Sequence, residues 1–302
     1  MVSLIGPRAE TWSDSDEEPE PPSVAVYRDA CLEAGKVPCG RWLRTCQTKS
    51  EECTLQHYGI GKKGSAPLGK SLRVNACVRV LDLSDNGLGT EGVQTLAKAL
   101  LGGGAPALTA LDLSQNQAGP DGAAALGELL AEQTAPDHGL QSLRFDNNAI
   151  GNKGAGLLTQ GLTDNRRLAE LHLCRNEIGC DGAAKIAEQL RDQGLAGNAS
   201  VTTLSLEWNQ IRVDGCRALL GACREGRVEV LDLGWNGVRD DACVAVAQLL
   251  HDGGAGHLRE LRLHHNHVSA TGGAALGAAL GVLEALDVSG NPLAAEVRPI
   301  SS

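Results

Sequence analysis

A nine-residue pattern recurs along the chain and constrains its fold more than any other feature. The clearest copy is Leu81-Asp82-Leu83-Ser84-Asp85-Asn86-Gly87-Leu88-Gly89. A degenerate copy begins at Cys53, and the copies then follow one another at intervals of 25 to 33 residues. The other near-copies begin at Leu111, Leu143, Leu171, Leu204, Leu231, Leu261 and Leu286. Self-similarity at such a period indicates stacked copies of one small structural unit.

Two columns of the pattern have a direct physical reason. The alternating leucines, such as Leu81 and Leu83, are what a short strand with one buried face requires. An asparagine follows each strand, and its amide can donate to and accept from backbone groups where the chain turns. This column contains Asn86, Asn116, Asn148, Asn176, Asn209, Asn236, Asn266 and Asn291. We therefore expect the asparagines to link each unit to its neighbour.

The second half of each unit reads as a helix. Apolar residues lie four apart, as in Leu96 and Leu100, and therefore share one helix face. Glycines recur where we expect little space between layers: Gly92, Gly122, Gly154, Gly182, Gly215 and Gly272. Strand, turn and helix, repeated about nine times, predict an α/β leucine-rich-repeat horseshoe. This solenoid has a parallel β-sheet on the concave face and helices on the convex face.

Three regions follow from this pattern. Residues 1–24 are acidic and rich in proline, and we expect a disordered leader. Residues 25–50 predict a helical N-terminal cap, with one helix closed by Gly35 and a second carrying Trp42. Residues 51–302 form the predicted solenoid. No helix is expected after the last strand, so either the sequence is truncated or a partner covers that edge.

Composition narrows the classes of partner and compartment. The net charge of −10 argues against nucleic acid and favours a partner with a basic surface. No uninterrupted apolar stretch is long enough for a membrane span, and the N-terminus lacks the apolar run of a signal peptide. The ten cysteines are therefore expected to be free thiols in the reducing cytoplasm.

The cap region also carries a family resemblance. Its residues Tyr27-x3-Cys31-x3-Gly35-x-Val37-Pro38-x3-Trp42-Leu43-Arg44 are followed by Leu55–Gly61. Together they resemble the leucine-rich-repeat-containing protein seventy-four family, whose repeat is shared with ribonuclease inhibitors. Tyr58 departs from the pattern, because it stands where the first repeat would carry asparagine. The resemblance implies an intracellular interaction protein without activity of its own, in a ciliary or cytoskeletal setting.

One motif matches a nucleotide-binding signature. Gly64–Ser71 reads Gly-Ser-Ala-Pro-Leu-Gly-Lys-Ser, which fits the phosphate-binding loop pattern. The repeat register instead places this segment inside a helix, with Lys70 on the solvent face and Pro67 in the first helical turn. Because such a loop needs free backbone amides at a helix start, we predict no nucleotide and no other cofactor.

Neither catalysis nor metal binding is predicted. The aspartates Asp82, Asp112, Asp232 and Asp287 share one column, but Arg144, His172, Ser205 and Arg262 occupy it too. Such a column is a mixed, solvated strip and contains no recognisable catalytic set. On a regular strand, His265 and His267 would share a face and His264 would point away. Two ligands are too few for a structural zinc site.

The residue before each asparagine gives the candidate binding surface. This column reads His57, Asp85, Gln115, Asn147, Arg175, Trp208, Trp235, His265 and Gly290. We expect it to project from the concave surface, which places Trp208 and Trp235 side by side on neighbouring strands, about 5 Å apart. Aromatic and arginine clusters are typical of interface hot spots. The alternative is that the two tryptophans form a local structural plug.

Further residues complete this candidate surface. Arg175 and His265 flank the tryptophans, with Glu207, Arg262 and His264 nearby. The sequence thus predicts a non-catalytic scaffold or adaptor that binds another protein through its concave face. Two alternatives stay open: an inhibitor or sensor of a basic protein, like the ribonuclease inhibitors, or a structural subunit of a ciliary or cytoskeletal assembly.

Overall fold

Within the residues that the structure describes, nine strands lie side by side in one parallel sheet, in chain order. The computed structural model describes residues 19–134, 139–191, 200–251, 256–278 and 281–293. The central leucines of β2 to β9 are paired with one another in register, and Cys53 takes that place in β1. The strands are β1 (Glu52–Thr54), β2 (Val80–Asp82), β3 (Ala110–Asp112), β4 (Ser142–Arg144), β5 (Glu170–His172), β6 (Thr203–Ser205), β7 (Val230–Asp232), β8 (Glu260–Arg262) and β9 (Ala285–Asp287).

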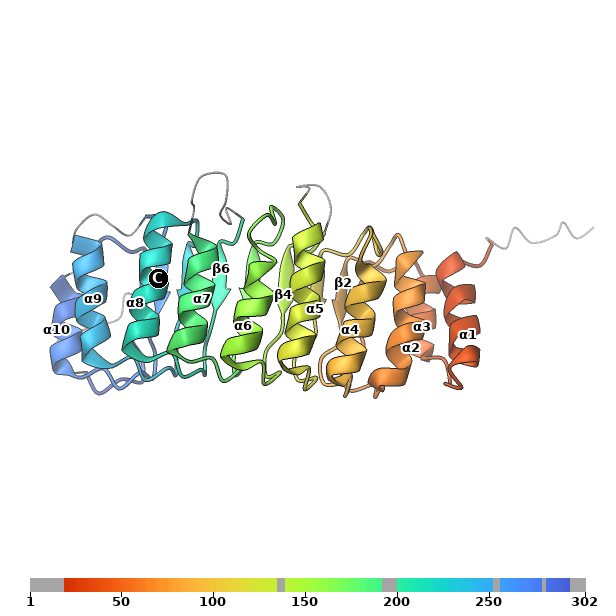
Figure 1. Cartoon of the computed structure of the whole chain (residues 1–302), viewed down its shortest axis with the longest axis horizontal. Coiled ribbons are helices and arrows are strands. Elements are labelled where there is room, and N and C mark those ends of the chain that lie inside the picture. Colours follow the sequence, from red (N-terminus) through yellow and green to blue (C-terminus); the bar gives the residue numbers. More distant parts are fainter. Residues whose placement is uncertain (1–18, 135–138, 192–199, 252–255, 279–280, 294–302) are drawn as a thin grey trace, which may run out of the picture.

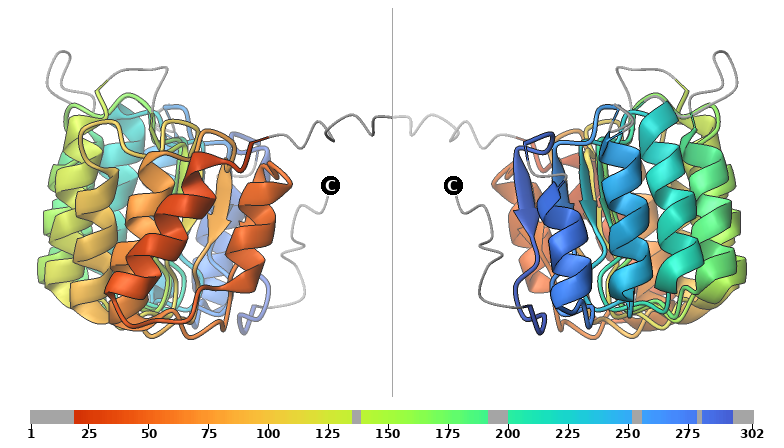
Figure 2. Two further views of the ribbon diagram at one scale, coloured as in Figure 1. Left: turned by 90° about the vertical axis from the view of Figure 1, so that its right-hand side faces the viewer. Right: turned by 90° about the vertical axis from the view of Figure 1, so that its left-hand side faces the viewer.

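A helix follows each of the first eight strands. These helices lie next to one another in chain order (Figure 1), and they cover one side of the sheet while the strands form the other layer (Figure 2). They are α3 (Gly61–Arg73), α4 (Gly89–Leu100), α5 (Gly119–Glu132), α6 (Gly151–Gln160), α7 (Cys180–Leu190), α8 (Arg212–Glu225), α9 (Arg239–His251) and α10 (Ala270–Ala278). The predicted α/β leucine-rich-repeat solenoid is confirmed.

Two cap helices precede the first repeat. They are α1 (Pro22–Glu33) and α2 (Gly40–Gln47). Trp42 is fully buried, and its indole donates a hydrogen bond to Ser71 Oγ in α3 at 3.0 Å. The helix α1 begins inside the segment that we assigned to the acidic leader, because Pro22 suits the first turn of a helix. The first 18 residues lie outside the described ranges.

The asparagine column links successive coils of the solenoid through hydrogen bonds. Asn148 is fully buried, and its side-chain oxygen accepts hydrogen bonds from the backbone N–H groups of Asn116 and Ala118 at 3.1 and 3.2 Å. Its amide nitrogen donates to Leu113 O at 3.0 Å and to Asp146 O at 3.1 Å. Asn86, Asn116, Asn176, Asn209, Asn236, Asn266 and Asn291 repeat this arrangement. Each amide therefore fixes the spacing of two consecutive coils.

Close helix contacts complete the stacking. A Cβ atom added to Gly127 in α5 would lie 2.4 Å from the carbonyl oxygen of Leu157 in α6. Gly92 and Gly154, which share one column of the repeat, are also tightly packed, since added Cβ atoms would lie 2.8 Å from Ser65 Oγ and 2.9 Å from Pro120 Cα. The absence of a side chain at these points lets adjacent helices approach closely. This agrees with the expected lack of space between layers.

We predict that Asn148→Ala destabilises the solenoid by about 3 kcal/mol, because it leaves several buried backbone groups without a partner. The change in the urea midpoint measures this effect. Asn147→Gly is the matched control, since Asn147 is exposed and its φ of 52° suits glycine. Equal urea midpoints for the two variants would contradict the proposed role of Asn148 in linking the coils.

We also predict that Gly127→Ala lowers stability by about 2 kcal/mol through overpacking of α5 against α6. The control is Gly221→Ala in α8, where an added Cβ would meet only the Arg191 guanidinium, at 3.8 Å. That change should stabilise the protein by about 0.5–1 kcal/mol through helix propensity. Thermal unfolding of both variants tests these two expectations. A shift of the thermal midpoint in the same direction for both variants would refute them.

Candidate functional site

The face of the sheet opposite the helices is hollowed. A depression of about 600 Å³ is lined by side chains from the ends of β2 to β8. Its floor carries the mixed column predicted from the sequence, because Asp82, Asp112, Arg144, His172 and Ser205 occupy successive strands in register. The surface is therefore polar and carries both signs of charge.

Part of the charge in this hollow is paired. Arg262 contacts Glu260 at 2.6 Å and Asp232 at 3.6 Å. These neighbours favour the charged guanidinium and raise the pKa of Arg262, against the effect of its partial burial. The positive charge of Arg262, on β8, is therefore balanced by these two carboxylates.

The one cysteine in the hollow is not prepared for catalysis. Burial, with a smaller contribution from the Asp146 carboxylate, raises the pKa of the Cys174 thiol to about 12. Because the thiolate is the nucleophile, this group stays protonated and unreactive at neutral pH. The Asp146 carboxylate accepts a hydrogen bond from the Cys174 backbone N–H at 2.7 Å, which is a structural contact.

The residue before each asparagine lies in a backbone bend, where the chain leaves the sheet. Its eight non-glycine members all have φ between 50° and 62°: His57, Asp85, Gln115, Asn147, Arg175, Trp208, Trp235 and His265. In this conformation the backbone N–H of Trp208 reaches Gly234 O at 3.0 Å, and that of Trp235 reaches His264 O at 3.0 Å. A bulky side chain in the left-handed region is uncommon and costs about 1–2 kcal/mol. The cross-strand hydrogen bonds offset this cost.

Four side chains of this column form one continuous stack, which we call the indole ladder: Arg175, Trp208, Trp235 and His265. The two indole rings lie 4.2 Å apart with an angle of 12° between their planes. His265 stacks on the far side of Trp235, also at 4.2 Å, and the Arg175 guanidinium lies 4.8 Å from the centre of the Trp208 ring. The expected neighbour relationship of the tryptophans is confirmed.

The ladder is exposed to solvent. Trp208 is 41% exposed and Trp235 is 38% exposed, although the faces of both rings are covered by their neighbours in the stack. Stacking at this spacing contributes about 0.5–1.5 kcal/mol per pair beyond the burial of area. The rings therefore hold one another in place while their edges remain available for contact.

A second row of side chains supports the ladder from inside the hollow. The His264 ring lies over Gly234, where an added Cβ would be 2.2 Å from the ring. His264 Nε2 thereby reaches Glu207 Oε1 at 3.2 Å, two strands away. His264 Nδ1 lies 3.6 Å from Asp287 Oδ2. Against the effect of partial burial, the hydrogen bonds from Ser289 lower the pKa of Asp287, and His264 makes a smaller contribution in the same direction. Glu207 and His264 are thus bound to each other rather than free.

The histidine triplet differs from its predicted geometry. The strand β8 ends at Arg262, so that His264, His265 and His267 lie in the following turn, where His265 and His267 have positive φ. The assumption of regular strand geometry was wrong, because the turn begins before the triplet. In the described ranges, no three His, Cys, Asp or Glu side chains are grouped so that they could hold a metal ion.

Two residues in the repeats of the tryptophans were not singled out from the sequence. Arg212 and Arg239 occupy the position three residues after the asparagine, with φ of 52° and 57°. The equivalent residues of the first four repeats are Gly61, Gly89, Gly119 and Gly151, all in the same bend. The sequence carries arginine at this position in the two repeats that contain the tryptophans, and serine (Ser269) in the repeat that follows them. We call Arg212 and Arg239 the bend arginines.

The nucleotide-like motif lies within α3. Lys70 is exposed and its amine contacts Glu33 at 2.7 Å, as its predicted position on the solvent face implies. The prediction that Pro67 lies in the first turn was wrong, since α3 begins at Gly61 and Pro67 is an interior residue. Gly61 turns the chain earlier than expected because its N–H bonds to Asn86 O. The helix therefore encloses the segment that a phosphate-binding loop would have to leave open.

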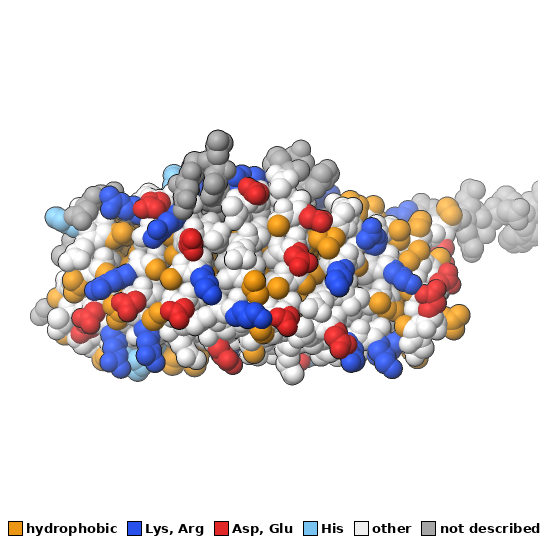
Figure 3. All heavy atoms as spheres, in the orientation of Figure 1, with side chains coloured by type: hydrophobic (Ala, Val, Ile, Leu, Met, Phe, Trp, Pro, Cys, Tyr) orange, Lys and Arg blue, Asp and Glu red, His pale blue; other side chains and the backbone are white. Residues whose placement is uncertain are grey.

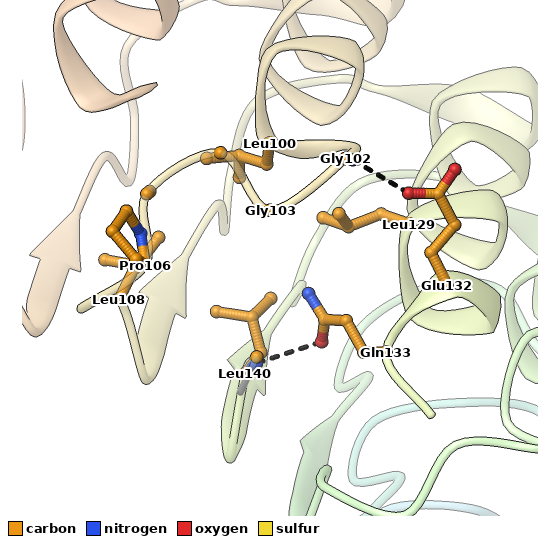
Figure 4. A pocket seen from close by; sticks show the side chains of 12 residues that line it. Leu100, Gly102, Gly103, Pro106, Leu108, Leu129, Glu132, Gln133 and Leu140 are labelled. Atoms are coloured by element: carbon orange, nitrogen blue, oxygen red, sulfur yellow. Dashed lines mark hydrogen bonds between the residues drawn. The ribbon is translucent and has the colours of Figure 1, made fainter. Parts of the chain in front are cut away.

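Another cavity lies among the loops that follow α4 and α5. It measures about 370 Å³ and is lined mainly by apolar groups, including Leu100 and Leu129 (Figure 4). Its polar groups are used within the wall, because Glu132 accepts a hydrogen bond from Gly102 N–H and Gln133 accepts one from Leu140 N–H. Because its polar groups are engaged in this way, we assign the cavity no function.

The helix-covered face carries charged side chains of both signs among its described residues, and these are interspersed over it (Figure 3). Several form isolated pairs between neighbouring helices, such as Lys62 with Glu91 and Lys153 with Asp121. Exposed pairs of this kind contribute little to stability. In the part of the chain that the structure describes, no helix is long and apolar enough to cross a membrane.

Known proteins share the repeat and the architecture. The leucine-rich-repeat family profile matches residues 74–97, 106–127, 197–220, 228–247 and 257–277. The ribonuclease inhibitor of Mus musculus is 28% identical over 178 residues, or 59% of this chain and 37% of the inhibitor. That of Sus scrofa is 29% identical over 225 residues, or 65% and 47%. The chain thus spans less than half the length of these relatives.

A solved structure supports the same fold. The leucine-rich repeat-containing protein LegL7 from Legionella pneumophila superimposes with a TM-score of 0.52 and 17% sequence identity, covering 90% of this chain and 89% of that one. At this level of identity the likeness concerns the fold alone. With the repeat register and the sheet described above, these likenesses identify the chain as a leucine-rich-repeat solenoid with ribonuclease-inhibitor-like relatives.

Proposed function

We propose that this protein is a non-catalytic scaffold or adaptor that binds another protein through the sheet face, centred on the indole ladder. The observation that carries the proposal is the exposure of two stacked tryptophans on one edge of a rigid sheet. Large aromatic side chains beside arginine are the residues that dominate the energy of protein interfaces. A solenoid also presents such residues on a long surface without rearrangement of the backbone.

The contacts of the ladder support binding over a purely structural plug. Each indole is stacked only on other ladder members, with their edges left in solvent. The core beneath consists of fully buried leucines such as Leu206 and Leu233, which fill the space between sheet and helices. The core therefore does not need the tryptophans in order to close.

We propose that this function is exercised in the cytoplasm, including a ciliary or cytoskeletal assembly there. All ten cysteines are free thiols in the structure, which suits a reducing compartment. The resemblance of the cap to the leucine-rich-repeat-containing protein seventy-four family is compatible with the same setting. No cofactor, metal, nucleotide, nucleic acid or membrane is part of the proposal.

We predict that Trp208→Ala combined with Trp235→Ala abolishes partner capture and changes the thermal midpoint little. The partner loses two anchors, whereas the solenoid loses only contacts within the ladder. Proximity labelling in cells, followed by mass spectrometry, compares the neighbours of the wild-type and variant proteins. Direct binding of each identified neighbour to the purified proteins then confirms or removes it.

Tyr58→Ala is the matched control, because Tyr58 is an exposed aromatic residue of the first repeat, outside the ladder. It should keep the neighbours of the wild-type protein. A large drop in thermal midpoint for the double tryptophan variant, with its neighbours retained, would show that the pair is a structural plug and would refute the proposal.

A second candidate is an inhibitor or sensor of a basic protein. The likeness to ribonuclease inhibitors and the net charge of −10 favour it. Titration of a basic pancreatic-type ribonuclease with the full chain discriminates the two functions. Stoichiometric loss of ribonuclease activity would support the inhibitor function. Unchanged ribonuclease activity in the presence of excess protein would support the scaffold function.

A further inference from the structure

We infer that the indole ladder and the bend arginines bind an acidic segment of a partner protein. This inference rests on the proposed function, because it uses the same surface, and it specifies the chemistry of the partner. The net charge of the chain points the other way, towards a basic partner. Local groups decide a contact, however, since charges beyond about 10 Å are screened at physiological salt.

The exposed parts of the two indoles attract negative groups. The π-faces of an aromatic ring are the negative part of its quadrupole, and its edges are the positive part. In the ladder, Arg175 and Trp235 cover the faces of Trp208, while Trp208 and His265 cover those of Trp235. The faces that would bind a lysine or arginine of a basic partner are therefore occupied.

The indole N–H groups point to the same kind of ligand. Each is a hydrogen-bond donor and cannot accept. Trp208 and Trp235 are both exposed, and neither indole nitrogen has a hydrogen-bond partner within the described residues. Carboxylate oxygens are strong acceptors, so an acidic segment can satisfy both donors.

Three arginines of the repeats that build the ladder have no carboxylate partner within the described residues. Arg175, Arg212 and Arg239 are exposed, and none of them forms an ion pair within 4.0 Å in the described part of the chain. Arg262 differs, because Glu260 and Asp232 neutralise it. The carboxylates of the second row are also engaged, since Glu207 and Asp287 both contact His264. The positive charges of these three arginines are therefore available to a ligand.

The placement of the bend arginines supports a binding role over a structural one. Their backbone N–H groups bond to Asn236 O and Asn266 O at 3.2 and 3.1 Å, as the glycines of earlier repeats bond to the next asparagine. Glycine performs this backbone role without the cost of a positive φ. The arginine side chains are therefore unnecessary for the bend, and they project from the two repeats that carry the tryptophans.

The test uses the isotope-labelled full chain and three probes. The first probe is a peptide of ten glutamates around one central phenylalanine, the second has lysines in place of the glutamates, and the third is a single-stranded DNA of ten nucleotides. The indole N–H signals of Trp208 and Trp235 report binding, after assignment with single tryptophan-to-phenylalanine variants. We expect only the glutamate peptide to shift both signals, with an affinity that falls as salt rises.

The decisive variants are Arg212→Gly and Arg239→Gly in combination. We expect about a tenfold loss of affinity for the glutamate peptide, with no decrease in thermal midpoint, because glycine suits the left-handed bend. The matched control is Arg217→Ala with Arg224→Ala, which removes two exposed positive charges from α8. The control should bind the peptide like the wild-type chain.

Each other outcome overturns the inference. Binding of the lysine peptide at the ladder would show a basic partner and would leave the concave scaffold standing. Binding of the DNA would show a nucleic-acid surface, and the absence of shifts with all three probes would remove the proposed chemistry. An equal loss of affinity in the control variant would reduce the effect to net charge. Failure of the scaffold itself is read separately, from the capture experiment with the tryptophan variant.

Discussion

The buried asparagine amides hold successive coils of the solenoid at one spacing, and the remaining features depend on that spacing. Asn148 satisfies four backbone groups that belong to two coils, and the other asparagines repeat this contact along the sheet. Since a buried and unpaired backbone group is costly, the chain has little freedom to shift one coil against the next. The register of the strands is therefore the same from β1 to β9.

A fixed register turns distant positions of the sequence into neighbours. Arg175, Trp208, Trp235 and His265 come from four consecutive repeats, yet they stack at distances close to the spacing of the strands. The backbone bend before each asparagine directs all four side chains the same way. A ladder of this kind needs no helix or loop of its own, because the repeat itself supplies the geometry.

The net charge of the whole chain differs in sign from the unpaired charges at the ladder. The whole chain is acidic, whereas the ladder edge carries unpaired arginines and ring edges. In the hollow beside it, Arg262 is matched by Asp232 and Glu260, and Glu207 by His264. Internal pairing thus neutralises these groups of the hollow, whereas Arg175, Arg212 and Arg239 form no ion pair within the described residues. For this reason the local geometry of the ladder, and not the net charge of the chain, guides the choice of partner.

The sequence by itself determined the fold and the position of the tryptophans. Both follow from periodicity, because a repeated strand, turn and helix can bury its leucines only by stacking, and the column of a residue then sets its direction. The expected neighbours Trp208 and Trp235 follow from counting back one residue from Asn209 and Asn236. Local errors arose where a bend precedes its expected place, as at Gly61 before α3 and in the turn that contains the histidine triplet.

Only the tertiary structure decided which groups remain free. His264 reaches Glu207 because Gly234 leaves room for its ring, and His265 leans between Trp235 and Gly290, where an added Cβ would overlap the ring. The conformations of these side chains depend on residues about 30 positions away in the chain, and a local sequence pattern does not reveal them. Whether an indole exposes a face or an edge is likewise settled by its neighbours across the sheet. The physical reason is that periodicity fixes the backbone and its directions, whereas rotamers and ion pairs are fixed by packing between coils.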